Sequence, residues 1–149
     1  MSVEKTAEQI LQEAIQNELE SYQLYSQAVD LTEAEELRGA LLKLAQEELG
    51  HQATLEQILT NPGDIGQIRH GERLDDVPAD TVGFTVLHPG STLQDVCLFA
   101  SRKEQQAYEL YRRMAEQSEG ETRDLLEAMA QEELQHKRMV ESWHRDTVC

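Results

Sequence analysis

Apolar residues recur at steps of three and four along four stretches of this chain, which is the spacing of one face of an α-helix. Short polar breaks separate the stretches within each half of the chain, and one much longer interruption separates the halves. In the first stretch the apolar positions are Ile10, Leu11, Ala14, Ile15, Leu19, Tyr22, Tyr25 and Val29. The pattern predicts an all-α protein with helices over residues 3–29, 33–59, 93–117 and 121–145.

Local signals predict three of the helix ends, two of them in the second helix. Thr32 with Glu35, and Thr92 with Asp95, have the three-residue spacing of a capping box, which indicates a helix start. An Asn-Pro-Gly turn at residues 61–63 ends the second helix.

The interruption, residues 61–91, holds all three prolines of the chain. A connection of about thirty residues is unusual in a compact domain unless it crosses the fold. We therefore expect two antiparallel hairpins joined by a long crossover connection, all within one domain of residues 1–149. Residues 81–87 predict a short extended piece within the crossover.

The second half of the chain repeats the first. The segment A-Q-E-E-L-G-H at residues 45–51 matches A-Q-E-E-L-Q-H at 130–136, at an offset of 85. A second match, at an offset of 86, pairs Glu18, Tyr22, Leu24 and Tyr25 with Glu104, Tyr108, Leu110 and Tyr111. Two similar hairpins related by a pseudo-twofold axis follow from this repeat.

Each copy of the repeat places acidic residues on an apolar helical face. Glu48 and His51 are three positions apart, so they share a face, and the second repeat has the same Glu-x-x-His pair. The glutamates of both pairs lie in line with apolar positions, as do two further glutamates in the first and third helices. The candidate metal ligands are Glu18, Glu48, His51, Glu104, Glu133 and His136.

Four inward carboxylates require compensation, because an unpaired buried charge costs several kcal/mol. Arg102 and Lys103 are near Glu104 in sequence, but neither falls on its stripe. Two divalent cations would balance the four negative charges, and the imidazoles would add neutral donors. A mixed carboxylate and imidazole set suits iron or manganese. We therefore predict two iron ions, with manganese or a mixed pair as the alternative.

One glutamate from each of two helices, plus Glu-x-x-His from each of the other two, is the donor arrangement of ferritin-like di-iron bundles. On these residues the chain resembles the rubrerythrin-type branch of the ferritin-like superfamily, over about residues 8–59 and 93–144. The resemblance implies a ferritin-like four-helix bundle in which Glu48 and Glu133 bridge the metals. It makes Glu18 and Glu104 terminal ligands and gives each metal one histidine, His51 or His136.

The resemblance also concerns the tyrosines. Tyr25 and Tyr111 match family tyrosines that hydrogen-bond the ligating carboxylates, and Tyr22 and Tyr108 are weaker candidates for which core packing is the alternative. Rubrerythrins carry a further glutamate where this chain has Ala107, so the redox-linked iron movement that uses it is not expected here. The rubredoxin-like domain is absent, so a separate protein would have to donate electrons.

Other residues are predicted to have ordinary roles. Glu47 and Glu132 lie one position off the ligand face and should be solvated. Cys97 is expected to be a buried thiol and Cys149 a free one, so no disulfide is indicated and a reducing compartment, the cytoplasm, is expected. Trp143 is assigned to core or interface packing. The histidines expected at the surface are His70, His88 and His144.

The chain is strongly acidic, with a net charge of -16 and a pI of about 4.6. This charge disfavours nucleic acid and membrane surfaces as partners, and no run of about twenty apolar residues is present to span a bilayer. Long amphipathic helices often leave a second apolar stripe, which would permit a homodimer.

Three functions fit the predicted site. The resemblance implies an oxidoreductase that reduces peroxide or O2 with Fe(II). The alternatives are a ferroxidase with iron storage or delivery, and a non-catalytic helical module with a structural metal.

Overall fold

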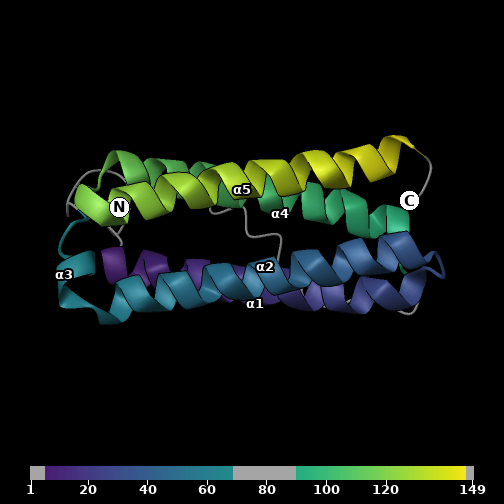
Figure 1. Ribbon diagram of the computed structural model, residues 1–149, viewed down its shortest axis with the longest axis horizontal. Coiled ribbons are helices and arrows are strands. Elements are labelled where there is room, and N and C mark those ends of the chain that lie inside the picture. The colour runs from purple at the N-terminus through teal and green to yellow at the C-terminus, as the bar shows by residue number, and fades with distance from the viewer. Residues whose placement is uncertain (1–5, 69–89, 147–149) are drawn as a thin grey trace, which may run out of the picture.

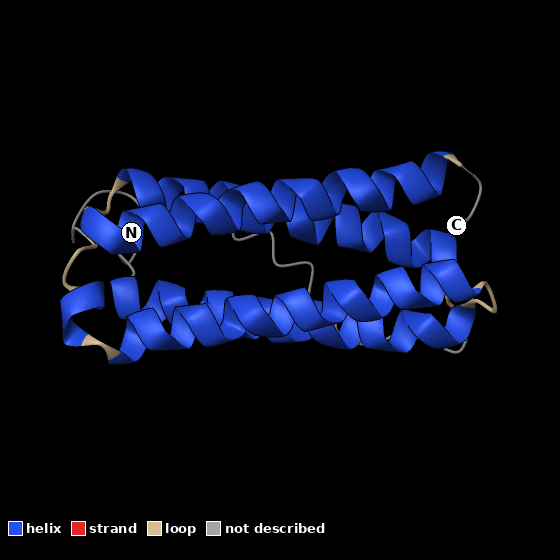
Figure 2. Cartoon of the chain, in the orientation of Figure 1, coloured by secondary structure: helices blue, strands red, loops and turns tan. Residues whose placement is uncertain are grey.

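The computed structural model describes residues 6–68 and 90–146, and within them the predicted all-α bundle is confirmed. Helices α1 (Ala7–Ala28) and α2 (Glu35–Thr60) form one hairpin, and α4 (Leu93–Glu116) and α5 (Gly120–Arg145) form the other (Figures 1 and 2). A 3-10 turn, η1 (Val29–Leu31), follows α1, and a one-turn helix, α3 (Pro62–Ile65), follows α2.

The two hairpins lie against each other so that α1 contacts α4 and α2 contacts α5. Figure 1 shows α1 and α5 running in one direction and α2 and α4 in the other. This up-down-down-up order is the one expected of two antiparallel hairpins joined by a long crossover connection. The extended piece predicted at 81–87 lies outside the described residues.

The helix ends follow local hydrogen bonding, and two predictions about them were wrong. The first helix begins at Ala7, because Thr6 is extended and its side chain accepts a hydrogen bond from the Gln9 amide. The capping box expected at Thr32 is absent: its hydroxyl accepts from the Ala34 amide instead, and α2 begins at Glu35 without a side-chain cap. The capping box at Thr92 is confirmed.

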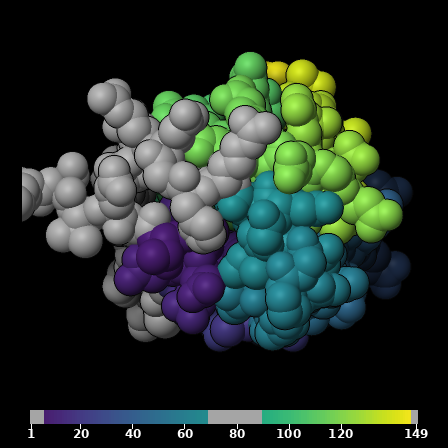
Figure 3. All heavy atoms as spheres, turned by 90° about the vertical axis from the view of Figure 1, so that its left-hand side faces the viewer, coloured from purple at the N-terminus to yellow at the C-terminus, as the bar shows by residue number. Residues whose placement is uncertain are grey.

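The turn between α4 and α5 is held by the segment that follows α3. Gln67 accepts from the amides of Glu119 and Thr122, through its backbone and its side chain respectively, and the Thr122 hydroxyl donates to the carbonyl of Asp64. Gly120 has φ 65°, the left-handed region that glycine adopts without strain. Figure 3 looks onto this end of the bundle, where the teal end of the first hairpin, which includes α3, lies against the light-green start of α5.

The hydrophobic core is divided into two clusters. The first cluster fills the end of the bundle where α1 begins, and the second fills the end where α1 finishes. Trp143 packs partly buried against the second cluster, which confirms its assignment to packing. The middle of the bundle, between the clusters, is left to polar side chains.

The state of Cys97 bears on the predicted compartment. Cys97 is buried as predicted, but it is disulfide-bonded, so its prediction as a free thiol was wrong. The other cysteine, Cys149, lies outside the described residues. Disulfides persist mainly in oxidising surroundings, so the cysteines no longer support a reducing compartment. Of the helices that the structure describes, none combines the length and apolar character that crossing a membrane requires.

Candidate metal centre

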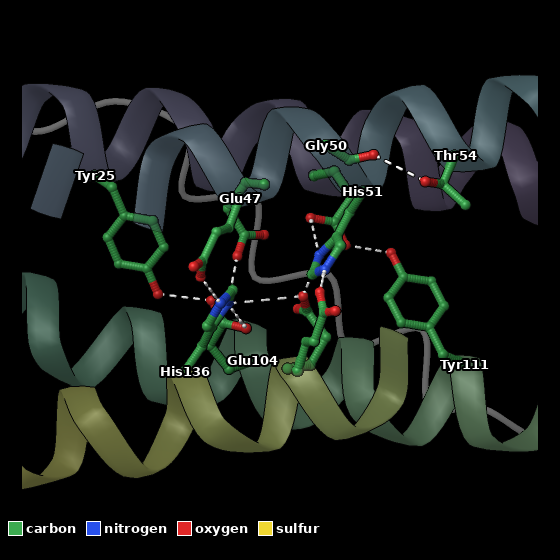
Figure 4. Close-up of polar contacts among 12 residues, drawn as sticks. Tyr25, Glu47, Gly50, His51, Thr54, Glu104, Tyr111 and His136 are labelled. Atoms are coloured by element: carbon green, nitrogen blue, oxygen red, sulfur yellow. Dashed lines mark hydrogen bonds and ion pairs between the residues drawn. The ribbon is translucent and has the colours of Figure 1, made fainter. Parts of the chain in front are cut away.

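The six predicted ligands meet in the middle of the bundle, one or two from each long helix. All six are buried, with at most 4% of each residue exposed. Because their helical phase matches that of the apolar residues before and after them, they face the bundle axis between the two hydrophobic clusters. Figure 4 shows the group enclosed between the two hairpins, with Tyr25 and Tyr111 at its opposite ends.

These residues form two overlapping donor sets, in each of which the donor atoms lie within 4.8 Å of one another. The first set is Glu18, Glu48, His51 and Glu133, and the second is Glu48, Glu104, Glu133 and His136. Glu48 and Glu133 belong to both sets, which is the position required of carboxylates that bridge two ions. The bridging and terminal roles that the resemblance implied stay predictions.

The histidines present the same ring atom to the centre. His51 Nδ1 lies 2.5 Å from Glu133 Oε1 and 3.6 Å from Glu18 Oε2. His136 Nδ1 lies 2.7 Å from Glu48 Oε1 and 3.6 Å from Glu104 Oε2. Each imidazole therefore has one nitrogen directed at a cluster of carboxylate oxygens.

Seven donor atoms of this site make no hydrogen bond to any described residue outside the group, and their ion-pair contacts are only with one another. They are Glu18 Oε2, both Glu48 oxygens, His51 Nδ1, Glu104 Oε2, Glu133 Oε1 and His136 Nδ1. Buried polar atoms are nearly always satisfied in proteins, so a concentration of orphans in one place needs an explanation. A metal ion requires oxygen and imidazole lone pairs that converge on it. Each of the two overlapping donor sets offers such a group of lone pairs, so the residues fit one ion in each set.

Two tyrosines hold the terminal carboxylates. The Tyr25 hydroxyl donates to Glu104 Oε1 at 2.7 Å, and the Tyr111 hydroxyl donates to Glu18 Oε1. In both glutamates the other oxygen, Oε2, is left without a partner. Each tyrosine therefore occupies Oε1 of its glutamate and leaves Oε2 available to a metal ion.

The weaker candidates Tyr22 and Tyr108 do not share this role. Both are partly buried and pack against the hydrophobic clusters. Within the described part of the chain, no hydrogen bond joins either hydroxyl to the six candidate ligands. The packing alternative is the one that fits them.

Glu47 and Glu132 are partly solvent-exposed, as predicted, but each also contacts a histidine, which the sequence analysis did not foresee. Glu132 Oε2 lies 2.5 Å from His51 Nε2, and Glu47 Oε2 lies 2.6 Å from His136 Nε2. The helical face was read correctly, since both carboxylates are partly exposed. Sequence could not show that each one reaches a histidine of the opposite hairpin, because that contact forms only when the hairpins dock.

The buried lysine that sequence placed near Glu104 does not neutralise the centre. Lys103 is the one buried lysine or arginine among the described residues, and its ammonium group is directed at α1. There it donates to Asn17 Oδ1 at 2.9 Å and to Glu20 Oε2 at 3.1 Å. The site carboxylates are therefore left to their histidines and to any bound cation.

Without metal, the buried carboxylates and histidines of the site shift one another's pKa values. Burial, followed by the charges of Glu104 and Glu18, raises the pKa of both Glu48 and Glu133 well above the ordinary range. Burial alone would also raise the pKa of Glu18, but contacts with Glu48 and His51 outweigh it and lower that pKa. The metal-free site therefore favours the protonated forms of Glu48 and Glu133.

The pKa values of the two histidines are raised, whereas burial alone lowers the pKa of an imidazole. Burial alone would lower the pKa of His51, but the adjacent carboxylates Glu133 and Glu18 outweigh it and raise the pKa to about 12. The pKa of His136 is raised as well, chiefly by Glu104 and Glu47 against the effect of burial. Metal binding to neutral imidazole and ionised carboxylate must therefore release protons.

We expect the metal-free protein to lose stability as pH rises from about 5 to 9. The native state retains protons on Glu48, Glu133 and His51 that the unfolded chain releases above its ordinary pKa values, 4.5 for Glu and 6.5 for His. Each retained proton lowers the free energy of unfolding by about 1.4 kcal/mol per pH unit. The lowered pKa of Glu18 makes the free energy of unfolding rise with pH instead, but this effect is confined to pH values below about 4.5.

Urea denaturation of metal-free protein across this pH range measures the effect. Glu48→Gln should flatten the slope and raise the free energy of unfolding at pH 8, because it removes one of the retained protons. Glu56→Gln, which removes an exposed charge from the same helix, should leave the slope unchanged. A stability that increases with pH would contradict the assigned protonation.

We expect Tyr25→Phe and Tyr111→Phe to weaken Fe(II) binding about ten-fold or more, because each leaves one carboxylate oxygen unpaired and one ligand less well oriented. Anaerobic calorimetric titration measures the change. Tyr22→Phe and Tyr108→Phe, in the same two helices, are the matched controls and should bind like the wild type. Equal losses in all four variants would contradict a specific role for the hydroxyls of Tyr25 and Tyr111.

Comparison with known proteins bears on the second hairpin directly. Residues 95–148 match the family model of rubrerythrin, and this segment includes Glu104, Glu133 and His136. No curated protein and no solved structure gives a significant match to the chain. The first hairpin supplies the same pattern through the internal repeat, and its donors complete the site. Over residues 95–148 the chain is therefore similar to rubrerythrin, and its described helices form an all-α bundle consistent with the ferritin-like fold.

Proposed function

We propose that this protein is a di-iron carboxylate oxidoreductase that reduces peroxide, with O2 as the second oxidant. The observation that supports this most strongly is the pair of buried donor sets that share Glu48 and Glu133. A single-ion site would need neither the shared carboxylates nor a histidine on each side. The rubrerythrin match supports iron as the metal.

The protein's own contribution begins with charge. When ionised, the four buried glutamates bring four negative charges into the middle of the bundle, and two divalent ions would balance them. Glu18 and Glu104 would each bind one ion through the oxygen that its tyrosine leaves unpaired. His51 and His136 would each supply one Nδ1. In this way each ion receives the same kinds of donors.

The second contribution is exclusion of water. The two hydrophobic clusters close the bundle on either side of the site, so interactions among charges there are stronger than in solvent. Two Fe(II) ions would supply the two electrons that, with two protons, convert one hydrogen peroxide to two waters. The chain holds the ions and keeps competing solvent away.

One departure from rubrerythrins narrows the proposal. Ala107 lies buried one turn after Glu104, where the resemblance led us to look for a further glutamate. The donor sets are consequently matched, with one terminal glutamate and one histidine on each side. We propose that both ions keep their donors through the redox cycle, and that a separate protein returns the electrons.

Stopped-flow mixing of the Fe(II)-loaded protein with hydrogen peroxide or with O2 tests this function. We expect optical changes of iron oxidation that are faster with peroxide than with O2, and faster than for free Fe(II). Glu48→Ala should lose the fast phase, since it removes a donor from both sets. Oxidation no faster than that of free Fe(II) would contradict the proposal. Preference for O2, with many irons retained per chain, would favour the storage alternative.

A further inference from the structure

Glu47 and Glu132 have no part in the donor sets, yet each contacts a ring nitrogen of a candidate ligand. Their side chains are 39% and 55% exposed, whereas the imidazoles that they contact are buried. A partly exposed glutamate that reaches a buried ring differs from a surface ion pair, whose contribution is usually small. The two contacts also obey the pseudo-twofold symmetry of the repeat.

We propose that Glu47 and Glu132 are positioning residues that orient the histidines of the opposite hairpin, an inference that rests on the proposed metal site. Glu132 on α5 holds His51 of α2, and Glu47 on α2 holds His136 of α5. Each carboxylate accepts a hydrogen bond from Nε2 and so leaves Nδ1 to face the centre. The two rings lie stacked, 5.8 Å apart and 25° from parallel.

An imidazole needs such a partner to act as a defined ligand. A neutral ring carries its proton on one nitrogen, and the hydrogen bond made by that nitrogen fixes both the tautomer and the ring orientation. Without an acceptor at Nε2, the ring can turn over and present the wrong nitrogen. A carboxylate is a suitable acceptor because it bonds the N–H strongly and makes the other nitrogen a better donor to metal.

The arrangement explains why the repeat contains two adjacent glutamates. Neighbouring helix positions point about 100° apart, so Glu48 can face the centre while Glu47 reaches across to α5. In the same way, Glu133 faces the centre while Glu132 reaches across to His51 of α2. The histidine four residues along the same helix is not the partner in either case: Glu47 bonds His136 and not His51. The E-E-x-x-H segment therefore carries a positioning residue for the other hairpin followed by its own two ligands.

The test uses full-length protein with labelled histidines, loaded with Zn(II) as a diamagnetic probe. In the wild type, NMR should show a slowly exchanging Nε2–H signal for both His51 and His136. Glu132→Ala should lose the signal of His51 and retain that of His136, and Glu47→Ala should do the reverse. This crossed pattern separates positioning from a general loss of structure, which would affect both signals.

Zn(II) titration of the same proteins gives the second measurement. The alanine variants should bind about 10- to 100-fold more weakly. Glu47→Gln and Glu132→Gln should recover much of the affinity and the Nε2–H signals, because an amide oxygen still accepts the bond. Glu56→Ala removes an exposed charge from α2 away from the site and should match the wild type.

The outcomes distinguish this inference from the proposed function. If the wild type binds two equivalents and both alanine variants retain their affinity and both signals, the positioning role is overturned while the metal site stands. Loss of the signal of the histidine in the same helix would also overturn it. If the wild type fails to bind two equivalents, the proposed metal site is overturned, and this inference with it.

Discussion

The mutual repulsion of four buried glutamates governs this structure. Each long helix contributes one of them to the same small region, and two hydrophobic clusters keep solvent from relieving the charge. The one buried lysine of the described residues is committed elsewhere, to Asn17 and Glu20. In the metal-free state, retained protons compensate part of the charge. Two divalent ions would balance the whole charge of the four ionised glutamates. A site whose carboxylates repel one another without metal is therefore well suited to binding cations.

The compensating contacts cross from one hairpin to the other. Tyr25 bonds Glu104 of the second hairpin, and Tyr111 bonds Glu18 of the first. The contacts of Glu47 and Glu132 with the histidines cross in the same way. In each hairpin, the donor residues are held by residues of the other hairpin. The donors therefore become organised only when the two hairpins dock. This gives a physical reason for the repeat: two copies of one hairpin pattern complete each other.

Sequence predicted the fold and the donor residues because both follow from helical periodicity. A glutamate in phase with Leu41 and Leu44 must face the core, whatever the neighbouring helices are. Features that depend on the docked hairpins were missed. The contact of Glu47 with His136 needs the position of α5, and no spacing of the cysteines indicated that Cys97 is disulfide-bonded. The cap at Thr32 failed for a local reason, since its hydroxyl bonds the amide two residues on.

The most direct measurement is the number and position of bound metals, from elemental analysis of Fe(II)-reconstituted protein and an anomalous-scattering map of its crystals. The account requires two ions per chain inside the bundle, with Glu48 and Glu133 between them and one histidine beside each. Fewer than two equivalents, or ions held only by exposed carboxylates, would contradict it.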